Sequence, residues 1–151
     1  MNYRQLVLMH IEANDDHAEL LNSAATETSA VDRVLRFKST ASAGNYLFGA
    51  EETAAAVPDL IILNLESSGG DGLEFLRLVR ANPITIAIPV VVFSTSESEQ
   101  QIKAAYRCGA NSYVVKPTTY SEMVIKLAEL NMYWSVTATL PRKVTDEACL
   151  V

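Results

Sequence analysis

The run at residues 58–65, PDLIILNL, constrains the fold of this chain more than any other stretch. Five of its eight residues are leucine or isoleucine, and a polar, glycine-rich segment follows at residues 66–72. A short apolar run between turn signals indicates a strand that is buried on both faces, as in parallel sheets. The end of such a strand faces the carboxyl edge of the sheet, where open α/β folds bind their ligands. The residue presented at that edge is Asn64.

Strand-like and helix-like segments alternate over the rest of the sequence. The other expected strands lie at residues 6–11, 34–38, 88–93 and 112–115. Helical patterns follow each strand, at residues 15–28, 42–56, 72–81 and 97–107 and from about residue 120 onward. Five alternations with short linkers predict a doubly wound α/β fold, in which helices cover both faces of a five-stranded parallel sheet.

Polar residues mark where several of these helices should begin. The candidate N-caps are Asn14 or Asp15 for the first helix, Ser96 in a capping box with Glu99 for the fourth, and Thr119 or Ser121 for the fifth. Gly109 should end the fourth helix, because glycine readily adopts the left-handed conformation found after helices. The last helix carries Met123, Leu127 and Trp134, which are expected to make core or dimer contacts.

The composition is that of a globular protein, with 49% apolar and 20% charged residues in a chain of 151. The expected division is one domain at residues 1–134 and a C-terminal tail at residues 135–151. A net charge of −6 argues against a nucleic-acid surface, which needs clustered lysine and arginine. Cys108 and Cys149 have no metal-ligand spacing. No apolar run is long enough for a membrane span and the first residues lack a signal-peptide pattern, so the expected location is the cytoplasm.

The ends of four expected strands bring Glu12, Asn64, Ser94 and Lys116 to one edge of the sheet. Motifs surround these positions: DLIILN at residues 59–64, GGDG at 69–72, PVVVFS at 89–94 and GANSYVVKP at 109–117. In this order and spacing, they make the sequence similar to the receiver domains of bacterial two-component response regulators over about residues 5–134. That resemblance implies a flavodoxin-like sheet with strand order 2-1-3-4-5. The end of the chain, with YW at residues 133–134 and LP at 140–141, resembles the single-domain receivers that partner bacterial phytochromes.

The resemblance also implies roles for the residues at this edge. In receivers, an aspartate that ends the third strand accepts a phosphoryl group from a histidine kinase, and two acidic residues after the first strand hold Mg²⁺. A serine or threonine and a lysine contact the phosphoryl oxygens, and an aromatic residue on the fifth strand reports the change. By position, the acceptor is Asn64, the acidic pair is Glu12 and Ala13, the phosphoryl contacts are Ser94 and Lys116, and the switch aromatic is Tyr113.

Two of these positions depart from the family pattern. Asn64 has an amide where the acceptor needs a carboxylate, and an amide is a very poor nucleophile toward phosphorus. Ala13 removes one of the two acidic metal ligands, and Mg²⁺ favours hard oxygen ligands such as carboxylates. No catalytic residue and no cofactor are therefore expected, and Glu12 alone should bind Mg²⁺ weakly if at all. Asp15 and Asp16 could substitute as ligands, but both should lie in the first helix.

Simpler structural roles compete with the functional ones. Lys116 would neutralise Glu12 instead of a phosphoryl group, Ser94 would cap a helix or bond to backbone, and Tyr113 would be a fixed surface aromatic. His10 should be a hydrogen-bonded core residue. His17 should be a solvated helix residue.

The predicted function is that of a divergent receiver, or pseudo-receiver, which acts as a protein-interaction module without being phosphorylated. Its partner would be a sensor histidine kinase or another signalling protein. The partner surface would be the fourth helix, fifth strand and fifth helix, including Ala105, Tyr106 and Tyr113, and the same face would serve a homodimer. One alternative is a working phosphorelay receiver with a displaced acceptor. Another is a small α/β enzyme or ligand-binding protein, which is disfavoured because no nucleophile–base pair is apparent.

Overall fold

A computed structural model describes residues 5–27, 30–49, 57–66 and 71–141 of the chain. The strands are β1 (Leu6–Ile11), β2 (Val31–Phe37), β3 (Leu60–Leu63), β4 (Val90–Ser94) and β5 (Ser112–Val115). The helices are α1 (Asp15–Thr26), α2 (Thr40–Phe48), α3 (Gly72–Ala81), α4 (Glu99–Arg107), α5 (Tyr120–Met132) and the π-helical turn η1 (Tyr133–Thr137). The strands form one parallel sheet in the order β2-β1-β3-β4-β5, which confirms the predicted fold and strand order.

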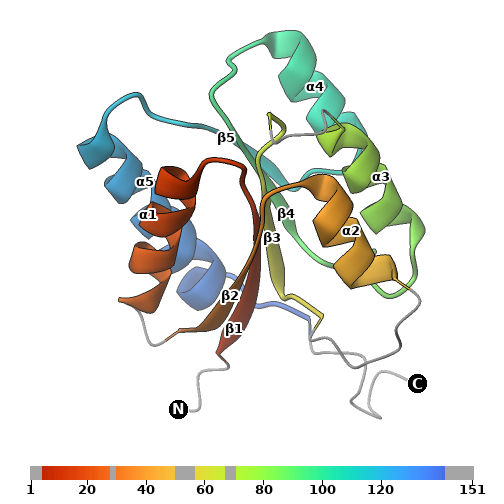
Figure 1. The fold of residues 1–151 in the computed structure, drawn as a ribbon, viewed down its shortest axis with the longest axis horizontal. Coiled ribbons are helices and arrows are strands. Elements are labelled where there is room, and N and C mark those ends of the chain that lie inside the picture. Colours follow the sequence, from red (N-terminus) through yellow and green to blue (C-terminus); the bar gives the residue numbers. More distant parts are fainter. Residues whose placement is uncertain (1–4, 28–29, 50–56, 67–70, 142–151) are drawn as a thin grey trace.

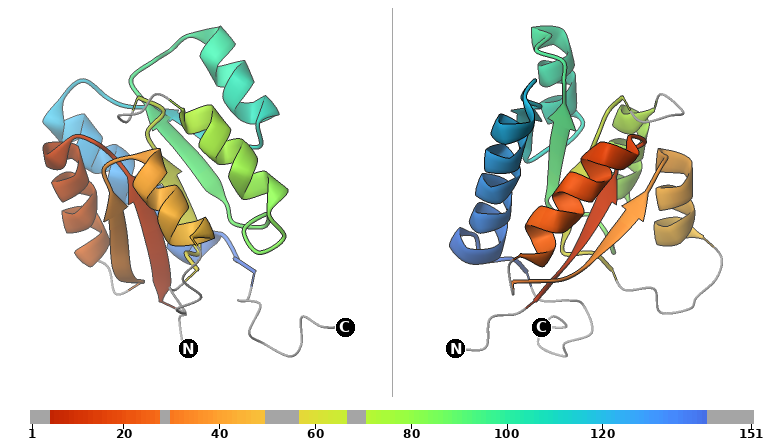
Figure 2. Two further views of the ribbon diagram at one scale, coloured as in Figure 1. Left: turned by 45° about the vertical axis from the view of Figure 1, so that its right-hand side comes forward. Right: turned by 60° about the vertical axis from the view of Figure 1, so that its left-hand side comes forward.

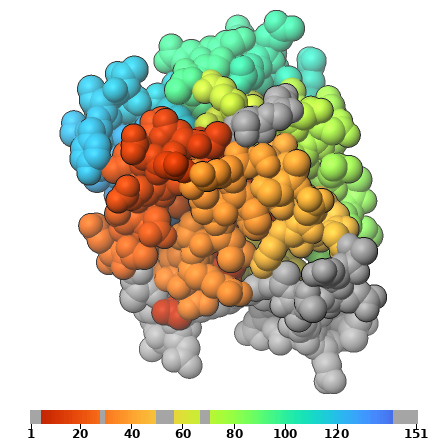
Figure 3. Space-filling view, in the orientation of Figure 1, coloured from red at the N-terminus to blue at the C-terminus, as the bar shows by residue number. Residues whose placement is uncertain are grey.

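The sheet lies between two layers of helices (Figures 1 and 2). Helices α1 and α5 pack on one face, and α2, α3 and α4 lie on the other. In Figure 3 the side chains of α1 and α2, with β2 between them, form much of the surface that faces the viewer. No helix within the described ranges is long and apolar enough to cross a membrane.

Every residue of β1, β3 and β4 is buried, because these strands are central and helices cover both sides. Successive side chains alternate between the two cores: Ile61 and Leu63 pack with α2 and α3, whereas Leu60 and Ile62 pack with α1 and α5. The run at residues 58–65 therefore contains the buried strand that the sequence predicted. The strand itself spans Leu60–Leu63, and Asn64 follows directly after it.

Several expected boundaries were wrong, and local bonding explains the differences. The helix expected at residues 42–56 begins at Thr40, because the Ser39 hydroxyl caps it, and it ends at Phe48; residues 50–56 lie outside the described residues. Ser98, not Ser96, caps α4. The strand expected from residue 88 begins at Val90, since Pro89 has no N–H to give to the ladder. The strand expected at 34–38 is β2, which begins earlier, at Val31.

The turn between α4 and β5 is held by Arg80 of α3. Gly109 has a φ of 107°, the left-handed conformation expected after this helix, and a Cβ there would lie 2.7 Å from Cγ of Arg80. The Arg80 guanidinium donates to the carbonyl oxygen of Gly109 at 2.9 Å and to Oδ1 of Asn111 at 2.7 Å. Asn111 Oδ1 also accepts from the backbone N–H of Val90. These bonds fix where β5 begins. They therefore also fix the position of Lys116, which directly follows the last residue of β5, Val115.

Candidate functional site

The centre of the site is a buried ion pair between the ends of two strands that are not neighbours. Glu12 follows β1 and Lys116 follows β5, and the Lys116 ammonium donates to Oε1 of Glu12. Both side chains are 1% exposed. Burial raises the pKa of Glu12, but the hydrogen bonds from Lys116 and Asn64 and the charge of Lys116 outweigh it, so the pKa lies below its usual value. The neutralising pair between Glu12 and Lys116 is thus present.

Asn64 lies between a carboxylate and a backbone amide, and these two partners fix the orientation of its side chain. Its Nδ2 donates to Oε2 of Glu12 at 2.6 Å, and its Oδ1 accepts from the N–H of Glu66 at 2.9 Å. A carboxylate at residue 64 could still accept from Glu66, but it could not donate to Glu12. An amide therefore fits this position better than a carboxylate, because it can donate to Glu12 and accept from Glu66 at the same time.

His17 of α1 completes this cluster, and the expectation that it is a solvated helix residue was wrong. Its Nδ1 lies 3.1 Å from Nζ of Lys116 and 3.5 Å from Oε1 of Glu12. Asn14 caps α1 by accepting from the N–H of His17, which places His17 in the turn of α1 closest to the sheet edge. The candidate cap Asn14 and the spacing of three residues between Asn14 and His17 were visible in the sequence. Combined with the position of Glu12, they could have indicated this contact.

A second group of polar side chains surrounds Ser94, which is fully buried at the end of β4. Its hydroxyl donates to Oε1 of Glu66 at 3.1 Å, and it accepts from the N–H of Ser96 at 3.2 Å and from Nε2 of Gln101 at 3.3 Å. The Thr95 hydroxyl also donates to Oε1 of Glu66, at 2.5 Å. Sequence reasoning missed Glu66, Thr95 and Gln101, although Thr95 directly follows β4 and Glu66 lies three positions after the last residue of β3.

The acidic residues after β1 are not gathered for a metal ion. Ala13 is exposed and offers no side-chain ligand. Asp15 lies in the first turn of α1, as expected, and binds Arg36 at 2.8 Å and Lys38 at 3.5 Å. The hydrogen bond from Arg36 lowers the pKa of Asp15, together with the charge of Lys38. Asp15 is thus held by β2 instead of substituting for Ala13.

Mg²⁺, which the fold family implies, does not fit the residues at this site. Oε1 of Glu12 is held by Lys116, and Oε2 accepts from Asn64 and from the N–H of Asn14. Asn64 directs its amide nitrogen toward Glu12, where a metal ion would need an oxygen. Among the described residues, no three histidine, cysteine or acidic side chains are grouped to hold a metal ion.

Tyr113 of β5 is half-buried and bonded at both its backbone and its side chain. Its hydroxyl donates to the carbonyl oxygen of Ser96 at 2.9 Å, and its N–H donates to the hydroxyl of Tyr106 at 3.1 Å. Tyr106 is exposed on α4. Ala105, expected on the same surface, is instead completely buried in the core, so that expectation was wrong.

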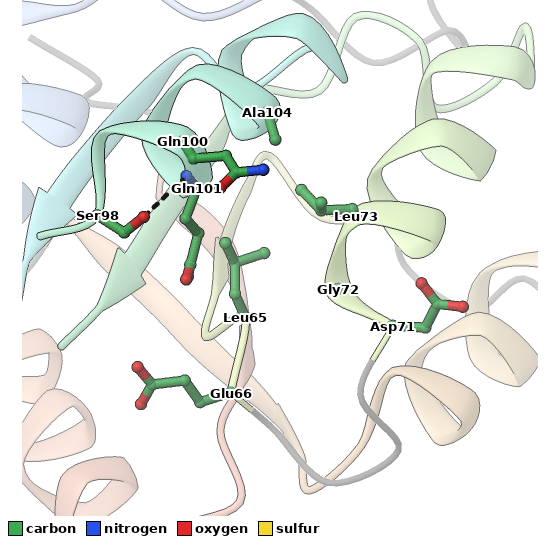
Figure 4. A pocket seen from close by; sticks show the side chains of 9 residues that line it. All are labelled: Leu65, Glu66, Asp71, Gly72, Leu73, Ser98, Gln100, Gln101 and Ala104. Atoms are coloured by element: carbon green, nitrogen blue, oxygen red, sulfur yellow. Dashed lines mark hydrogen bonds between the residues drawn. The ribbon is translucent and has the colours of Figure 1, made fainter. Parts of the chain in front are cut away.

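An open cavity of about 480 Å³ lies beside this edge, between the β3–α3 connection and α4 (Figure 4). Its lining includes Glu66 and Asp71 on one side and Gln100 and Gln101 on the other. In Figure 4 the Glu66 side chain points away from Asp71, so the two carboxylates are not converged on one point. The direction of Glu66 agrees with its bonds to Ser94 and Thr95.

His10 lies in the middle of β1 and is buried, but it is not the hydrogen-bonded core residue that was expected. Neither of its ring nitrogens has a hydrogen-bond partner within the described residues. Burial is the main cause that lowers the pKa of His10 to about 3, and the positive charges of Lys116 and Arg36 add to it. His10 is therefore neutral in the folded protein at physiological pH.

We expect that replacing His10 with leucine will remove part of the acid sensitivity of the fold. The folded-state pKa is below the unfolded value of about 6.5, so the contribution of neutral His10 is fully present above pH 6.5 and is lost as the pH falls toward 3. At pH 5 this loss is about 2 kcal/mol. The free energy of unfolding of the wild type should fall by about 2 kcal/mol more than that of His10→Leu between pH 7 and pH 5. Urea unfolding followed by circular dichroism would measure both. Equal losses for both proteins would show that His10 binds its proton equally well in the folded and unfolded states.

A five-stranded parallel sheet in this order, with a lysine, a serine and an acidic residue at its carboxyl edge, defines a receiver-type signalling domain. A family model for the response regulator receiver domain matches residues 9–128, and the chain belongs to that family.

Particular relatives include the probable methanogenesis regulatory protein FilR2 of Methanothrix harundinacea, 29% identical over 85% of this chain and 83% of FilR2. The response regulator Rcp1 of Synechocystis is 34% identical over 56% of this chain and 57% of Rcp1. Among solved structures, the phosphorylated cyanobacterial phytochrome response regulator RcpA superimposes with a TM-score of 0.86 at 30% identity, covering 91% of this chain and 99% of RcpA. The Mn²⁺-bound form of Rcp1 gives a TM-score of 0.83 at 27% identity, with the same coverage.

Proposed function

We propose that this receiver domain is a pseudo-receiver, a protein-interaction module of two-component signalling that works without phosphorylation and has no enzymatic activity of its own. The observation that carries the proposal is the engagement of Asn64. Its amide nitrogen donates to Glu12, whose other oxygen is held by Lys116. The acceptor position, the acidic position and the lysine position are thereby bonded to one another.

The charges at the site support the same proposal. A receiver that is phosphorylated with Mg²⁺ needs carboxylates to hold the metal ion and a lysine free to meet the phosphoryl group. Here Lys116 is 1% exposed and neutralises Glu12, and Ala13 supplies no carboxylate. Removing Lys116 from Glu12 would leave a buried charge without a partner, which is costly. The site is therefore stable without an added anion and metal ion.

For the partner, we propose a sensor histidine kinase or another signalling protein. The similarity to RcpA, a cyanobacterial phytochrome response regulator, makes a phytochrome-type sensor the first kinase class to test. The proposed contact surface consists of α4, β5 and α5. Its described part carries exposed apolar side chains, among them Tyr106 on α4 and Ile125 on α5. The same surface is the proposed contact in a homodimer.

The proposal predicts the result of a phosphorylation experiment. The intact mass of the protein should be unchanged after incubation with acetyl phosphate and Mg²⁺, because an amide at residue 64 does not attack phosphorus. Asn64→Asp, treated in parallel, is the matched variant in which the acceptor carboxylate is restored. A phosphoryl group gained by the variant alone would support the proposal and show that the reagent was active.

The opposite result would replace this proposal with a phosphorelay receiver whose acceptor is displaced. A gain of one phosphoryl mass on the wild-type chain would establish it. The chemistry of the new acceptor would then follow from whether the added group is lost in acid or in base, and from peptide mapping. A wild-type gain that persists in Asn64→Ala would place the acceptor away from residue 64.

A further inference from the structure

The hydroxyl of Ser94 has no hydrogen-bonding capacity left for another ligand. A serine hydroxyl has one hydrogen to donate and two lone pairs to accept with. The N–H of Ser96 and Nε2 of Gln101 are donors, so they use the two lone pairs, and the hydroxyl hydrogen must point to Glu66. Thr95 adds a second hydroxyl donor to the same carboxylate oxygen.

We propose that the Glu66 carboxylate is a built-in anionic ligand for the hydroxyls of Ser94 and Thr95, and that it holds the β4–α4 connection and Tyr113 in one arrangement. Bonds from hydroxyls to a carboxylate are charge-assisted and stronger than neutral ones. Glu66 comes from the end of β3 and its partners from the end of β4, so the contact ties two adjacent strand ends together. Glu66 is thus a positioning residue, acting through the hydroxyls that it binds.

A continuous series of hydrogen bonds connects Glu66 to the surface formed by α4 and β5. Ser94, which donates to Glu66, accepts from the N–H of Ser96, and the carbonyl oxygen of Ser96 accepts from the Tyr113 hydroxyl. The Ser96 hydroxyl also accepts from the N–H of Ser98, the cap of α4. The start of α4 and the ring of Tyr113 are thereby both bonded to Ser96, whose position depends on Ser94.

This inference rests on the proposed function for its purpose, because a module that is not phosphorylated needs another way to keep its contact surface in one state. The structural claim itself does not involve phosphate. Its test therefore uses the untreated protein, and it can fail while the phosphorylation experiment still agrees with a pseudo-receiver.

The test is amide hydrogen exchange at Ser96 and Ser98, with the ring resonances of Tyr113 followed by NMR. Glu66→Ala should raise exchange at both amides about tenfold, the effect expected for the loss of one charged hydrogen bond, and should shift the Tyr113 ring resonances. Glu66→Gln, which keeps an oxygen acceptor without the charge, should fall between the wild type and Glu66→Ala. The matched control is Glu74→Ala, which removes an exposed carboxylate paired with Arg77 on α3 and should change neither readout.

A double-mutant cycle distinguishes a direct bond between Glu66 and Thr95 from a general destabilisation of the β4–α4 connection. Thr95→Ala should raise the same exchange rates, and adding Glu66→Ala to it should have a smaller effect than Glu66→Ala has in the wild type. Additive effects of the two substitutions would overturn the proposal. Unchanged exchange and unchanged Tyr113 resonances in Glu66→Ala would overturn it too, and a Glu66→Gln variant identical to the wild type would refute the requirement for an anion.

Discussion

Replacing Lys116 with methionine is expected to destabilise the protein by about 3–5 kcal/mol at pH 7, the cost of leaving one member of a buried ion pair without its partner. The expected loss is large because Glu12 and Lys116 are both 1% exposed, so water cannot replace the missing ammonium. Asn64 and the N–H of Asn14 would still donate to Glu12, but neither carries a charge.

The same substitution should reverse the pH dependence that Glu12 contributes. In the wild type the pKa of Glu12 lies below its usual value, so its contribution is present above the unfolded-state pKa and is lost as the pH falls. In Lys116→Met, burial dominates and raises this pKa. The destabilisation should then be greatest at neutral pH and should diminish as the pH falls through this raised pKa toward the unfolded value. Below the unfolded value, Glu12 of the variant is protonated in both the folded and the unfolded state.

Urea unfolding followed by circular dichroism at pH 7 and pH 4 would measure both effects. The double variant Glu12→Gln with Lys116→Met should recover most of the loss at pH 7, because no buried charge is left unpaired. Lys103→Met is the surface control: Lys103 pairs with Glu99 on exposed α4, and its loss should cost at most about 0.5 kcal/mol. A loss of similar size in Lys116→Met and Lys103→Met would show that the Glu12–Lys116 pair contributes little.

Asn64→Asp is expected to cost about 2–4 kcal/mol at pH 7, even though it restores the family's acidic residue. The amide nitrogen lies 2.6 Å from Oε2 of Glu12, so a carboxylate there would replace a donor with a second negative charge. Two like charges about 4 Å apart repel by about 4 kcal/mol at an effective dielectric constant near 20, and Lys116 offsets part of this. Within the part of the chain that the structure describes, Lys116 is the one positively charged side chain buried with the two carboxylates.

The repulsion should depend on pH, which distinguishes it from a simple loss of hydrogen bonds. The paired carboxylates would raise the pKa of one of them, so the penalty should be full at neutral pH and relieved as the pH falls and that group binds a proton. Asn64→Ala is the control, because it removes the amide without adding a charge. Its loss of stability relative to the wild type should change less between pH 7 and pH 4 than that of Asn64→Asp in thermal unfolding, because only the hydrogen bond that lowers the pKa of Glu12 is lost. A stable Asn64→Asp variant at pH 7 would contradict the tight matching of the amide to Glu12.

The fold was predictable because its signals are local and agree with one another. The apolar run at residues 58–65 and the alternation of strands and helices were sufficient for the sheet, and the order of polar strand ends placed Glu12, Asn64, Ser94 and Lys116 on one edge. Helix boundaries were less predictable, because Ser39 and Ser98 compete as caps with nearby serines that are equally good by type.

The contacts within the site were only partly predictable. Pairing of Glu12 with Lys116 follows from opposite charges at the same edge of the sheet, although β1 and β5 are not adjacent. His17 reaches them only because Asn14 starts α1 at one particular residue. Glu66 is exposed and lies three positions after the last residue of β3, so nothing in the sequence indicated that it would turn toward Ser94 and Thr95. The sequence also did not indicate that the ring nitrogens of His10 have no hydrogen-bond partner among the described residues, since this depends on which side chains surround the middle of β1.

The burial of the Glu12–Lys116 pair has a consequence for how the domain responds to its ionic surroundings. Dissolved salt screens charges that face water, over about 8 Å at physiological ionic strength, but it screens buried pairs much less. Exposed pairs such as Asp15 with Lys38 should weaken as salt is added, while the bond that joins the ends of β1 and β5 should hold. The carboxyl edge of this sheet should therefore keep its arrangement from dilute buffer to concentrated salt.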